Sequence, residues 1–281
     1  MTEFTDKIFK VLAADQYLDI RYREWGAADN TNLAICVHGL SRNCQDFDNL
    51  AASLANDWRV LAVDMPGRGK SDWLANKTDY GYPLYETICK ALLARIGAND
   101  IAWIGTSMGG NIGMRLASQP GTLISKLVLN DIGPFVPIDG RRHNQADFGK
   151  DPRFESAETG IDHVRKTRSV FGPFDEAGWQ KFGHDSLRPL PGGQWTLHYD
   201  PGLSQPGSSI QSTDNWDLWS LITCPVLTMW GTESKILTAD VVERMASTGP
   251  KSVIHEVPGV GHCPGLTTAD EIERIAAFLA N

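Results

Sequence analysis

A serine and a histidine, far apart in the chain, have neighbours that suit nucleophilic catalysis. Ser107 is the central residue of Gly105-Thr-Ser-Met-Gly109, which has the pattern G-x-S-x-G. His262 lies in a glycine-rich loop that follows the apolar run 252–257 and precedes the last helical pattern. A serine hydroxyl attacks a carbonyl efficiently only when a nearby base takes its proton, and histidine is the usual base. The two residues therefore indicate acyl transfer through a covalent intermediate.

The elements on either side of Ser107 favour this interpretation over a tight glycine turn with an inert serine. The apolar run Ile101–Ile104 directly precedes the motif, and a helical pattern covers 111–118. A serine in a strained strand-to-helix turn projects its hydroxyl at the helix N-terminus, where backbone N–H groups favour developing negative charge. We therefore predict that Ser107 is the nucleophile.

A second loop supplies a candidate oxyanion hole. His38-Gly39-Leu40 follows the apolar run 33–37. A loop in this position can bring the backbone N–H of Leu40 beside that of Met108, so that both bind the oxyanion of a tetrahedral intermediate. His38 comes too early in the chain order to be the base, and we expect it to hold this loop in place.

The elements that position these residues alternate between strands and helices. Short, nearly continuous apolar runs at 33–37, 60–63, 101–104, 126–129 and 225–229 are typical of strands buried on both faces. Helical spacings and a capping box at Thr268 separate or follow them. This alternation predicts an α/β fold with a mostly parallel sheet flanked by helices.

The alternation fails between residues 134 and 215, a stretch rich in glycine, proline and aromatic residues. We interpret it as an inserted, mainly helical cap (lid) subdomain over the carboxyl ends of the strands, where ligands bind in open α/β sheets. The core would then comprise residues 1–133 and 216–281.

Five motifs occur in a characteristic order along the chain. They are His38-Gly-Leu-Ser-Arg-Asn43, Asp64-Met-Pro-Gly-Arg-Gly-Lys-Ser71, Gly105-Thr-Ser-Met-Gly-Gly110, Leu129-Asn-Asp-Ile-Gly-Pro134 and Pro258-Gly-Val-Gly-His262. Together they resemble the α/β-hydrolase superfamily, in its serine hydrolase branch with a helical cap after the sixth strand. The resemblance implies the α/β-hydrolase fold, hydrolytic activity, and a catalytic role for His262.

The resemblance leaves two candidates for the acid that orients His262. Such an acid usually follows the seventh strand in this family, often as an aspartate beside the serine of Gly231-Thr-Glu-Ser-Lys-Ile236, where this chain has Lys235. Glu233 could serve from that loop, although it follows the glycine closely. Some members place the acid after the sixth strand, where this chain has Asp131. We predict Asp131, with Glu233 as the alternative, and a structural role for Asp64 in its turn.

Composition restricts the partners. The 281 residues are 42% hydrophobic and 21% charged, with a formal charge of −8, which argues against nucleic acid or an anionic membrane as the main partner. No apolar run is long enough for a membrane span, and residues 1–14 lack the apolar core of a signal peptide. The five scattered cysteines suggest neither a disulfide framework nor a zinc site. We expect a cytoplasmic monomer or homodimer acting on a small molecule, without a metal or organic cofactor.

The sequence limits the substrate only to a class. Arg42, Asn43 and Trp195 are candidate substrate contacts, and an arginine in the pocket would favour a carboxylate-bearing substrate. The leading hypothesis is hydrolysis of a small carboxylic ester or lactone through an acyl-enzyme. The same residues could instead cleave a carbon–carbon bond in a vinylogous diketone, or an amide. A ligand receptor on a hydrolase scaffold is a further alternative, although such receptors usually have a broken triad.

Overall fold

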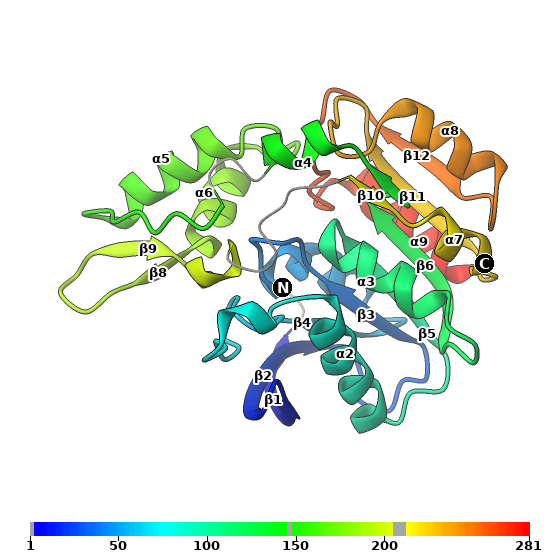
Figure 1. The fold of residues 1–281 in the computed structure, drawn as a ribbon, viewed down its shortest axis with the longest axis horizontal. Helices are drawn as coiled ribbons and strands as arrows, with labels where there is room; N and C mark the ends of the chain where they lie inside the picture. Colours follow the sequence, from blue (N-terminus) through cyan, green and yellow to red (C-terminus); the bar gives the residue numbers. More distant parts are fainter. Residues whose placement is uncertain (1–2, 145–147, 205–211) are drawn as a thin grey trace.

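An eight-stranded sheet forms the centre of the protein (Figure 1). The computed structural model describes residues 3–144, 148–204 and 212–281. Strands β1 and β2 form an antiparallel hairpin, β2 is also antiparallel to β4, and the remaining neighbours are parallel. In order across the sheet the strands are β1 (Phe4–Ala13), β2 (Gln16–Trp25), β4 (Arg59–Val63), β3 (Leu33–Val37), β5 (Ile101–Thr106), β6 (Ile124–Asn130), β11 (Val226–Gly231) and β12 (Val253–Val257).

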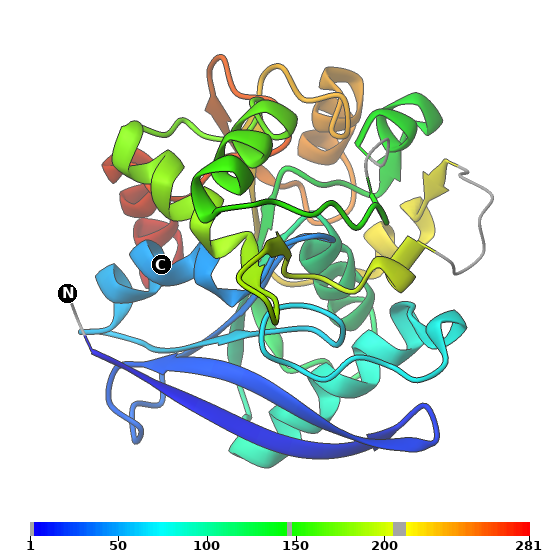
Figure 2. The same cartoon turned by 90° about the vertical axis from the view of Figure 1, so that its left-hand side faces the viewer.

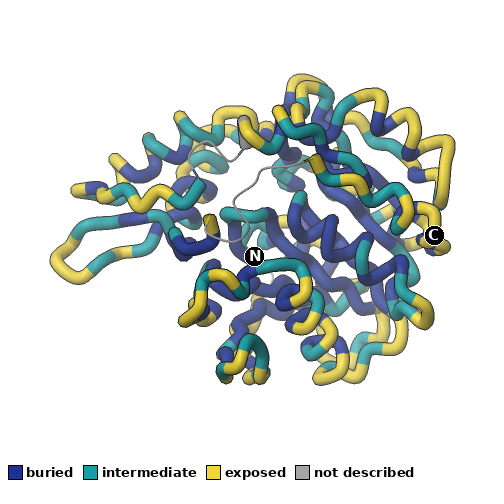
Figure 3. The backbone as a smooth tube through the Cα atoms, viewed as in Figure 1, coloured by how far each residue is buried: buried dark blue, intermediate teal, exposed yellow. Residues whose placement is uncertain are grey.

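Helices cover both faces of this sheet, and each face has its own hydrophobic core. Helices α1 (Asp48–Leu54) and α9 (Ala269–Ala280) pack on one face. Helices α2 (Tyr82–Ile96), α3 (Met108–Ala117), α7 (Trp216–Leu221) and α8 (Ala239–Ser247) belong to the core on the other. The central strands are accordingly buried along their length (Figure 3). A mostly parallel sheet between two helical layers confirms the predicted fold class.

The region predicted as the cap extends from the core toward the left in Figure 1. Its elements are β7 (Phe135–Val136), α4 (Ile138–Asn144), α5 (Ala157–Thr167), α6 (Glu176–Asp185), β8 (Leu187–Pro189), β9 (Trp195–Leu197), the 3-10 helix η3 (Pro201–Ser204) and β10 (Thr213–Asp214). The region is mainly helical, as predicted, but it also contains two short antiparallel strand pairs that the sequence did not reveal.

One of those pairs joins the two ends of the cap. Val136 of β7 is opposite Thr213 of β10, so the chain leaves the core and returns to it at one place. Strands of two or three residues are too short to show an alternating pattern in the sequence. Within the described residues, no helix has the length and apolar character needed to cross a membrane.

Candidate active site

Ser107 occupies the turn between β5 and α3 with φ +50° and ψ −107°. A Cβ atom on Gly109 would lie 1.9 Å from the carbonyl oxygen of Val37, and one on Gly105 would lie 2.4 Å from the carbonyl carbon of Gly109. Any side chain at either glycine would therefore collide with backbone. Close packing around a strained turn explains why this serine is flanked by glycines two residues away on each side.

His262 connects Ser107 to Asp131. Its Nε2 atom is 2.9 Å from Oγ of Ser107, and its Nδ1 atom is 2.7 Å from Oδ2 of Asp131. His262 lies in the loop between β12 and α9, whereas Asp131 directly follows β6 and is fully buried. When Nδ1–H donates to the carboxylate, the Nε2 lone pair is free to accept the serine proton. The three side chains thus have the geometry of a Ser–His–Asp triad.

The loop after β11 also supports Asp131. The backbone N–H of Gly231 donates to Oδ1 of Asp131 at 3.0 Å, and the hydroxyl of Ser234 donates to Oδ2 at 2.6 Å. Glu233, the alternative acid, is exposed, and its backbone N–H donates to the carbonyl of Val260. This loop therefore supplies a hydroxyl to Asp131, and the structure does not bring the Glu233 carboxylate to His262.

The loop after β3 lies against the nucleophile. A Cβ atom on Gly39 would be 3.7 Å from Cβ of Ser107. The carbonyl of Gly39 accepts hydrogen bonds from Nδ1 of His38 at 2.7 Å and from the N–H of Arg42 at 3.2 Å. This carbonyl shares a planar peptide unit with the N–H of Leu40. The two hydrogen bonds therefore fix the direction of the first predicted oxyanion donor.

His38 is a buried structural histidine in this geometry. Its Nε2 atom accepts a hydrogen bond from the N–H of Met65 at 3.0 Å. Nδ1 must then carry the proton that it donates to Gly39. Burial lowers the pKa of His38 to about 4, so the ring is neutral at ordinary pH. The partners of His38 are backbone groups, which agrees with its expected role in holding the loop.

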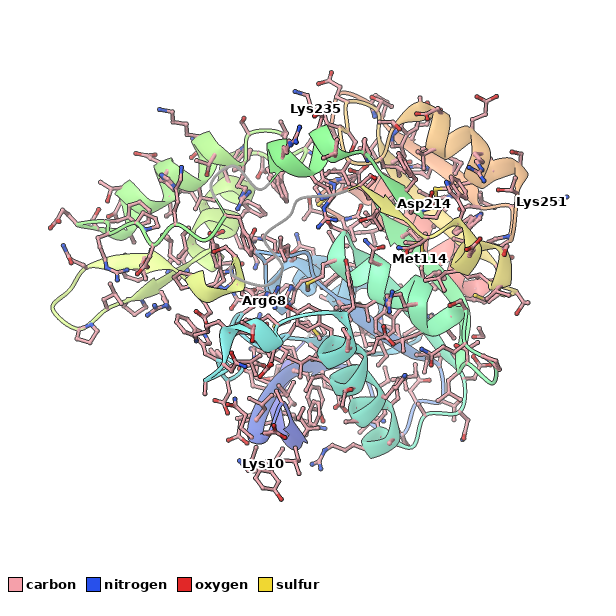
Figure 4. The ribbon with its side chains drawn as sticks, in the orientation of Figure 1. Lys10, Arg68, Met114, Asp214, Lys235 and Lys251 are labelled. Carbon is pink, nitrogen blue, oxygen red and sulfur yellow. The ribbon has the colours of Figure 1, made fainter. Side chains whose placement is uncertain are left out.

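Arg68 is a support for the oxyanion loop that sequence reasoning missed. Its buried guanidinium donates to the carbonyl of Leu40 at 2.9 Å and to the hydroxyl of Tyr85 at 2.9 Å, and it approaches Sδ of Met108 at 3.4 Å. Figure 4 shows Arg68 where the cap meets the core. Met108 is the first residue of α3, so its N–H has no acceptor within the helix. Arg68 thus links both residues predicted to donate to an oxyanion.

Asp64 supports the turn after β4, as expected. Its carboxylate accepts hydrogen bonds from the N–H of Cys44 at 2.8 Å and of Lys70 at 3.0 Å, and from the guanidinium of Arg21 at 3.1 Å. These contacts satisfy the buried charge locally and place Asp64 outside the triad.

Two of the three candidate substrate contacts connect the core to α6 of the cap. Nε of Arg42 donates to both carboxylate oxygens of Asp46 at 3.0 Å, and its guanidinium also donates to Ser186. Nδ2 of Asn43 donates to the carbonyl of Asp185 at 2.7 Å. Because the charge of Arg42 is already paired, the structure does not favour a carboxylate-bearing substrate at this position.

Trp195, the third candidate, lies within the cap. Its backbone exchanges two hydrogen bonds with Phe154, at 2.8 and 2.9 Å, and its ring packs against the cap's own hydrophobic cluster. It is not among the walls of the cavity described next. Trp195 therefore stabilises the cap in this structure.

A cavity of about 700 Å³ lies beside the triad, between the core and α6. Its walls include Thr106, Asn130 and Cys263, which are the chain neighbours of Ser107, Asp131 and His262 respectively. Several of its walls are aromatic, and one of them, Phe171, lies 6.4 Å from the imidazole of His262 between ring centroids. The aromatic walls are Phe47, Phe171, Phe174 and Phe182.

Comparison with known proteins shows the family. Residues 34–275 match the family described as "Alpha/beta hydrolase family". A 3-hydroxybutyrate-oligomer hydrolase from Cupriavidus necator is 36% identical over 267 residues, which cover 92% of this chain and 91% of that protein. The chain therefore belongs to the α/β-hydrolase family, and it is a serine hydrolase.

More distant relatives share the same framework. A 2-hydroxy-6-oxononadienedioate/2-hydroxy-6-oxononatrienedioate hydrolase from Dechloromonas aromatica is 24% identical over 96% of this chain and 93% of that protein. The crystal structure of a putative hydrolase from Rickettsia typhi superposes with a TM-score of 0.90, at 29% identity over 99% of both chains. These similarities confirm the family resemblance predicted from the ordered motifs.

Proposed function

We propose that the protein hydrolyses carboxylic esters of short hydroxy acids, with oligomers of 3-hydroxybutyrate as the first candidates. The observation that carries this proposal is the hydrogen-bonded series Ser107–His262–Asp131 in a chain that matches, along nearly its whole length, a relative named for hydrolysis of such oligomers. Serine attack on an ester carbonyl needs this nucleophile and base, and an oxyanion site next to them.

In the proposed mechanism, Oγ of Ser107 forms a bond to the ester carbonyl carbon while Nε2 of His262 takes its proton. The N–H groups of Leu40 and Met108 stabilise the oxyanion, and Asp131 stabilises the imidazolium. The carbon–oxygen bond of the ester then breaks, and the leaving alkoxide takes the proton from His262. Water, deprotonated by His262, attacks the acyl-enzyme and releases the acid, which regenerates Ser107.

The cavity beside the triad suits the uncharged, partly apolar part of such an oligomer, with its terminal carboxylate outside this cavity. Its aromatic walls would contact methyl groups of a hydroxyalkanoate chain, and the pairing of Arg42 with Asp46 leaves no strong anion site there. In this proposal the cavity holds part of the ester away from the scissile bond. A lactone of similar size would use the same groups.

The test is hydrolysis of the linear dimer and trimer of 3-hydroxybutyrate, with chromatographic measurement of the monomer. We expect monomer release by the wild-type protein and none above background by Ser107→Ala. Labelling with a fluorophosphonate checks the nucleophile independently of substrate. If the protein is labelled at Ser107 but cleaves neither oligomer, the substrate class is wrong while the serine hydrolase mechanism stands.

Carbon–carbon bond hydrolysis is the second candidate, and similarity to the hydrolase from Dechloromonas aromatica favours it. The same triad would act on a vinylogous diketone. Incubation with such a compound should consume its conjugated chromophore and release two products. Turnover of the diketone but not of the esters would make this the better assignment.

A further inference from the structure

Strand β1 forms one outer edge of the central sheet and exposes apolar side chains to solvent. Among the described strands it pairs only with β2, and Figure 2 shows it running along the outside of the molecule. Phe4, Ile8 and Leu12 are 44%, 59% and 59% exposed. Alternate residues of a strand share one face, so these three side chains form a single row. An exposed edge with apolar side chains is a template for pairing with another strand.

The complete row of side chains on this face is complementary to the same row running in the opposite direction. Along this face β1 reads Phe4, Asp6, Ile8, Lys10 and Leu12, which is apolar, acidic, apolar, basic, apolar. In an antiparallel pair of two copies centred on Ile8, Phe4 would be opposite Leu12 of the second copy, and Asp6 would be opposite Lys10. Cross-strand pairs of these kinds stabilise a sheet.

Neighbouring registers lack this match. The smallest shift that keeps side chains on their faces is two residues. A shift in one direction places Lys7 opposite Lys7, and a shift in the other places Ile8 opposite Lys10 and Asp6 opposite Leu12. Larger shifts place Asp6 opposite Asp6, or Lys10 opposite Lys10. On the row that carries the exposed apolar residues, charge complementarity therefore selects the register centred on Ile8, although the other face then has Lys7 opposite Phe9.

Strand β2 continues the charge pattern on each side. Within one chain, Asp6 is opposite Arg23 and Lys10 is opposite Asp19. Lys10 contacts Asp19 at 2.5 Å, and Asp6 contacts the buried guanidinium of Arg21 at 2.5 Å and lies 3.4 Å from Nε of Arg23. Across the paired copies, each charged row would contain Arg23 and Asp6 of one copy followed by Lys10 and Asp19 of the other. The sign of the charge would alternate from each residue to the next.

The two outer apolar positions follow the same rule, whereas Ile8 at the centre is opposite Arg21. Phe4 is opposite Trp25, with ring centroids 5.5 Å apart, and Leu12 is opposite Tyr17, which is 69% exposed. Pairing two copies would bring Phe4 of one chain against Leu12 of the other and extend each row to four apolar side chains. The pairing would then cover the flanks of these exposed apolar side chains.

We propose that the protein forms a two-fold homodimer in which β1 pairs antiparallel with β1 of a second copy, centred on Ile8. The pairing joins the two eight-stranded sheets into one continuous sheet. It does not depend on the proposed substrate, because β1 lies at the far edge of the sheet from β11, whose loop supports Asp131. Figure 4 shows Lys10 on this outer hairpin, distant from the cap.

Charge exchange across the axis tests both the surface and the register. Light scattering during gel filtration should give a dimer for the wild-type protein. Asp6→Lys or Lys10→Asp alone would place like charges opposite each other, and each should raise the dimer dissociation constant by about tenfold or more. The double variant Asp6→Lys/Lys10→Asp restores opposite charges across the axis. It also breaks the intrachain pairs of Asp6 with Arg21 and of Lys10 with Asp19, but these are lost equally in monomer and dimer. The double variant should therefore recover the dimer, and thermal unfolding checks that each variant is folded. Val253→Lys, on the opposite edge strand β12, is the matched control and should remain dimeric.

A cross-linking experiment guards against variants that fold poorly. Residues at a two-fold antiparallel centre are opposite themselves, with Cα atoms about 4.5–5.5 Å apart, within the range of a disulfide. Ile8→Cys should therefore form a disulfide-linked dimer under mild oxidation much faster than Val253→Cys. The five native cysteines are buried, so they should compete little.

Three results would overturn the proposal. A wild-type protein that stays monomeric well above micromolar concentration contradicts the dimer. A dimer that is insensitive to both single charge changes uses another surface. Failure of the double variant to recover, together with no preferential cross-link at position 8, excludes the register.

Discussion

Oδ2 of Asp131 accepts a hydrogen bond from Nδ1 of His262 at 2.7 Å and another from the hydroxyl of Ser234 at 2.6 Å. Two separate loops thus meet at one carboxylate oxygen. The histidine loop follows β12 and the serine loop follows β11, while Asp131 itself directly follows β6. A fixed, buried carboxylate orients the imidazole and stabilises its charged form, so the support from Ser234 has a direct bearing on turnover.

Replacing Asp131 with asparagine should lower kcat by about 10,000-fold, because the amide cannot stabilise the imidazolium as the carboxylate does. Thermal unfolding should show that the fold is kept. Glu233→Gln is the control and should retain near-normal kcat, since Glu233 is exposed. The opposite pattern, with loss only in Glu233→Gln, would transfer the role of the acid to Glu233.

Ser234→Ala should lower kcat by about tenfold to a hundredfold, because it removes a hydrogen bond to a charged carboxylate. The matched control is Thr232→Ala in the same loop, whose hydroxyl accepts from the N–H of Gly259 rather than contacting Asp131. Steady-state kinetics with any hydrolysed ester measures both. Equal effects of the two substitutions would mean that Ser234 acts only by shaping the loop.

His38 should make stability depend on pH in the acidic range. Burial lowers its pKa from 6.5 to about 4, so the unfolded chain binds a proton at a pH where the folded protein does not. Between those values the unfolded state binds more protons, and stability falls as pH falls. The contribution is present above about pH 6.5 and decreases by up to about 3 kcal/mol toward pH 4.

Urea unfolding of the wild type and of His38→Asn at pH 7.5, 6 and 5 measures this effect. The variant should be less stable at pH 7.5 and should lose less stability on acidification. Part of the wild-type dependence should remain, because burial also lowers the pKa of His198. Parallel curves for the two proteins would show that His38 is not the source.

Ala177→Trp should test the role of the cavity. Ala177 is an exposed wall residue on α6, so an indole there would obstruct the cavity without disturbing the triad. We expect kcat/KM to fall at least about tenfold for a trimeric ester, with little change for a short acetyl ester. Gln180→Trp, also exposed on α6 but not a cavity wall, is the control. Equal losses on both esters would remove the cavity from substrate binding.

Much of the fold could be predicted from the sequence because buried strands have a simple pattern. The run 33–37 was predicted with the bounds that the structure gives, and 101–104 lies within β5. Strand β1 was not predicted, since charged residues alternate with its apolar ones and the pattern resembles a solvated segment. The short strands of the cap were missed because two or three residues are too few to show an alternating pattern.

The part of the candidate site that lies within the five ordered motifs could be predicted from the sequence. The structure brings Ser107, His262 and Asp131 together as the sequence led us to expect. Arg68 and Ser234 were missed because their roles depend on which carbonyl or carboxylate they meet in space. The sequence did contain signals for both: Arg68 lies within the Asp64–Ser71 motif, and Ser234 is next to Glu233. Trp195 was predicted as a substrate contact from its residue type, and the structure places its ring against the cap's own hydrophobic cluster.

The contacts of α6 with the loop after β3 also determine how the cap can move. Asn43 bonds the carbonyl of Asp185, Arg42 bonds Ser186, and Lys181 contacts Asp48 at 2.9 Å. A rigid rotation of the cap that lifted α6 away from this loop would break all three contacts together. A rotation about the line that joins the three contacts would break none of them. A second set of contacts holds the cap elsewhere, because the backbone N–H of Asp200 donates to the carbonyl of Gly67 and the Asp200 carboxylate accepts from the hydroxyl of Tyr80. The cap is therefore anchored to the core at two separate places, and a hinge motion that opened one of them would have to spare the other.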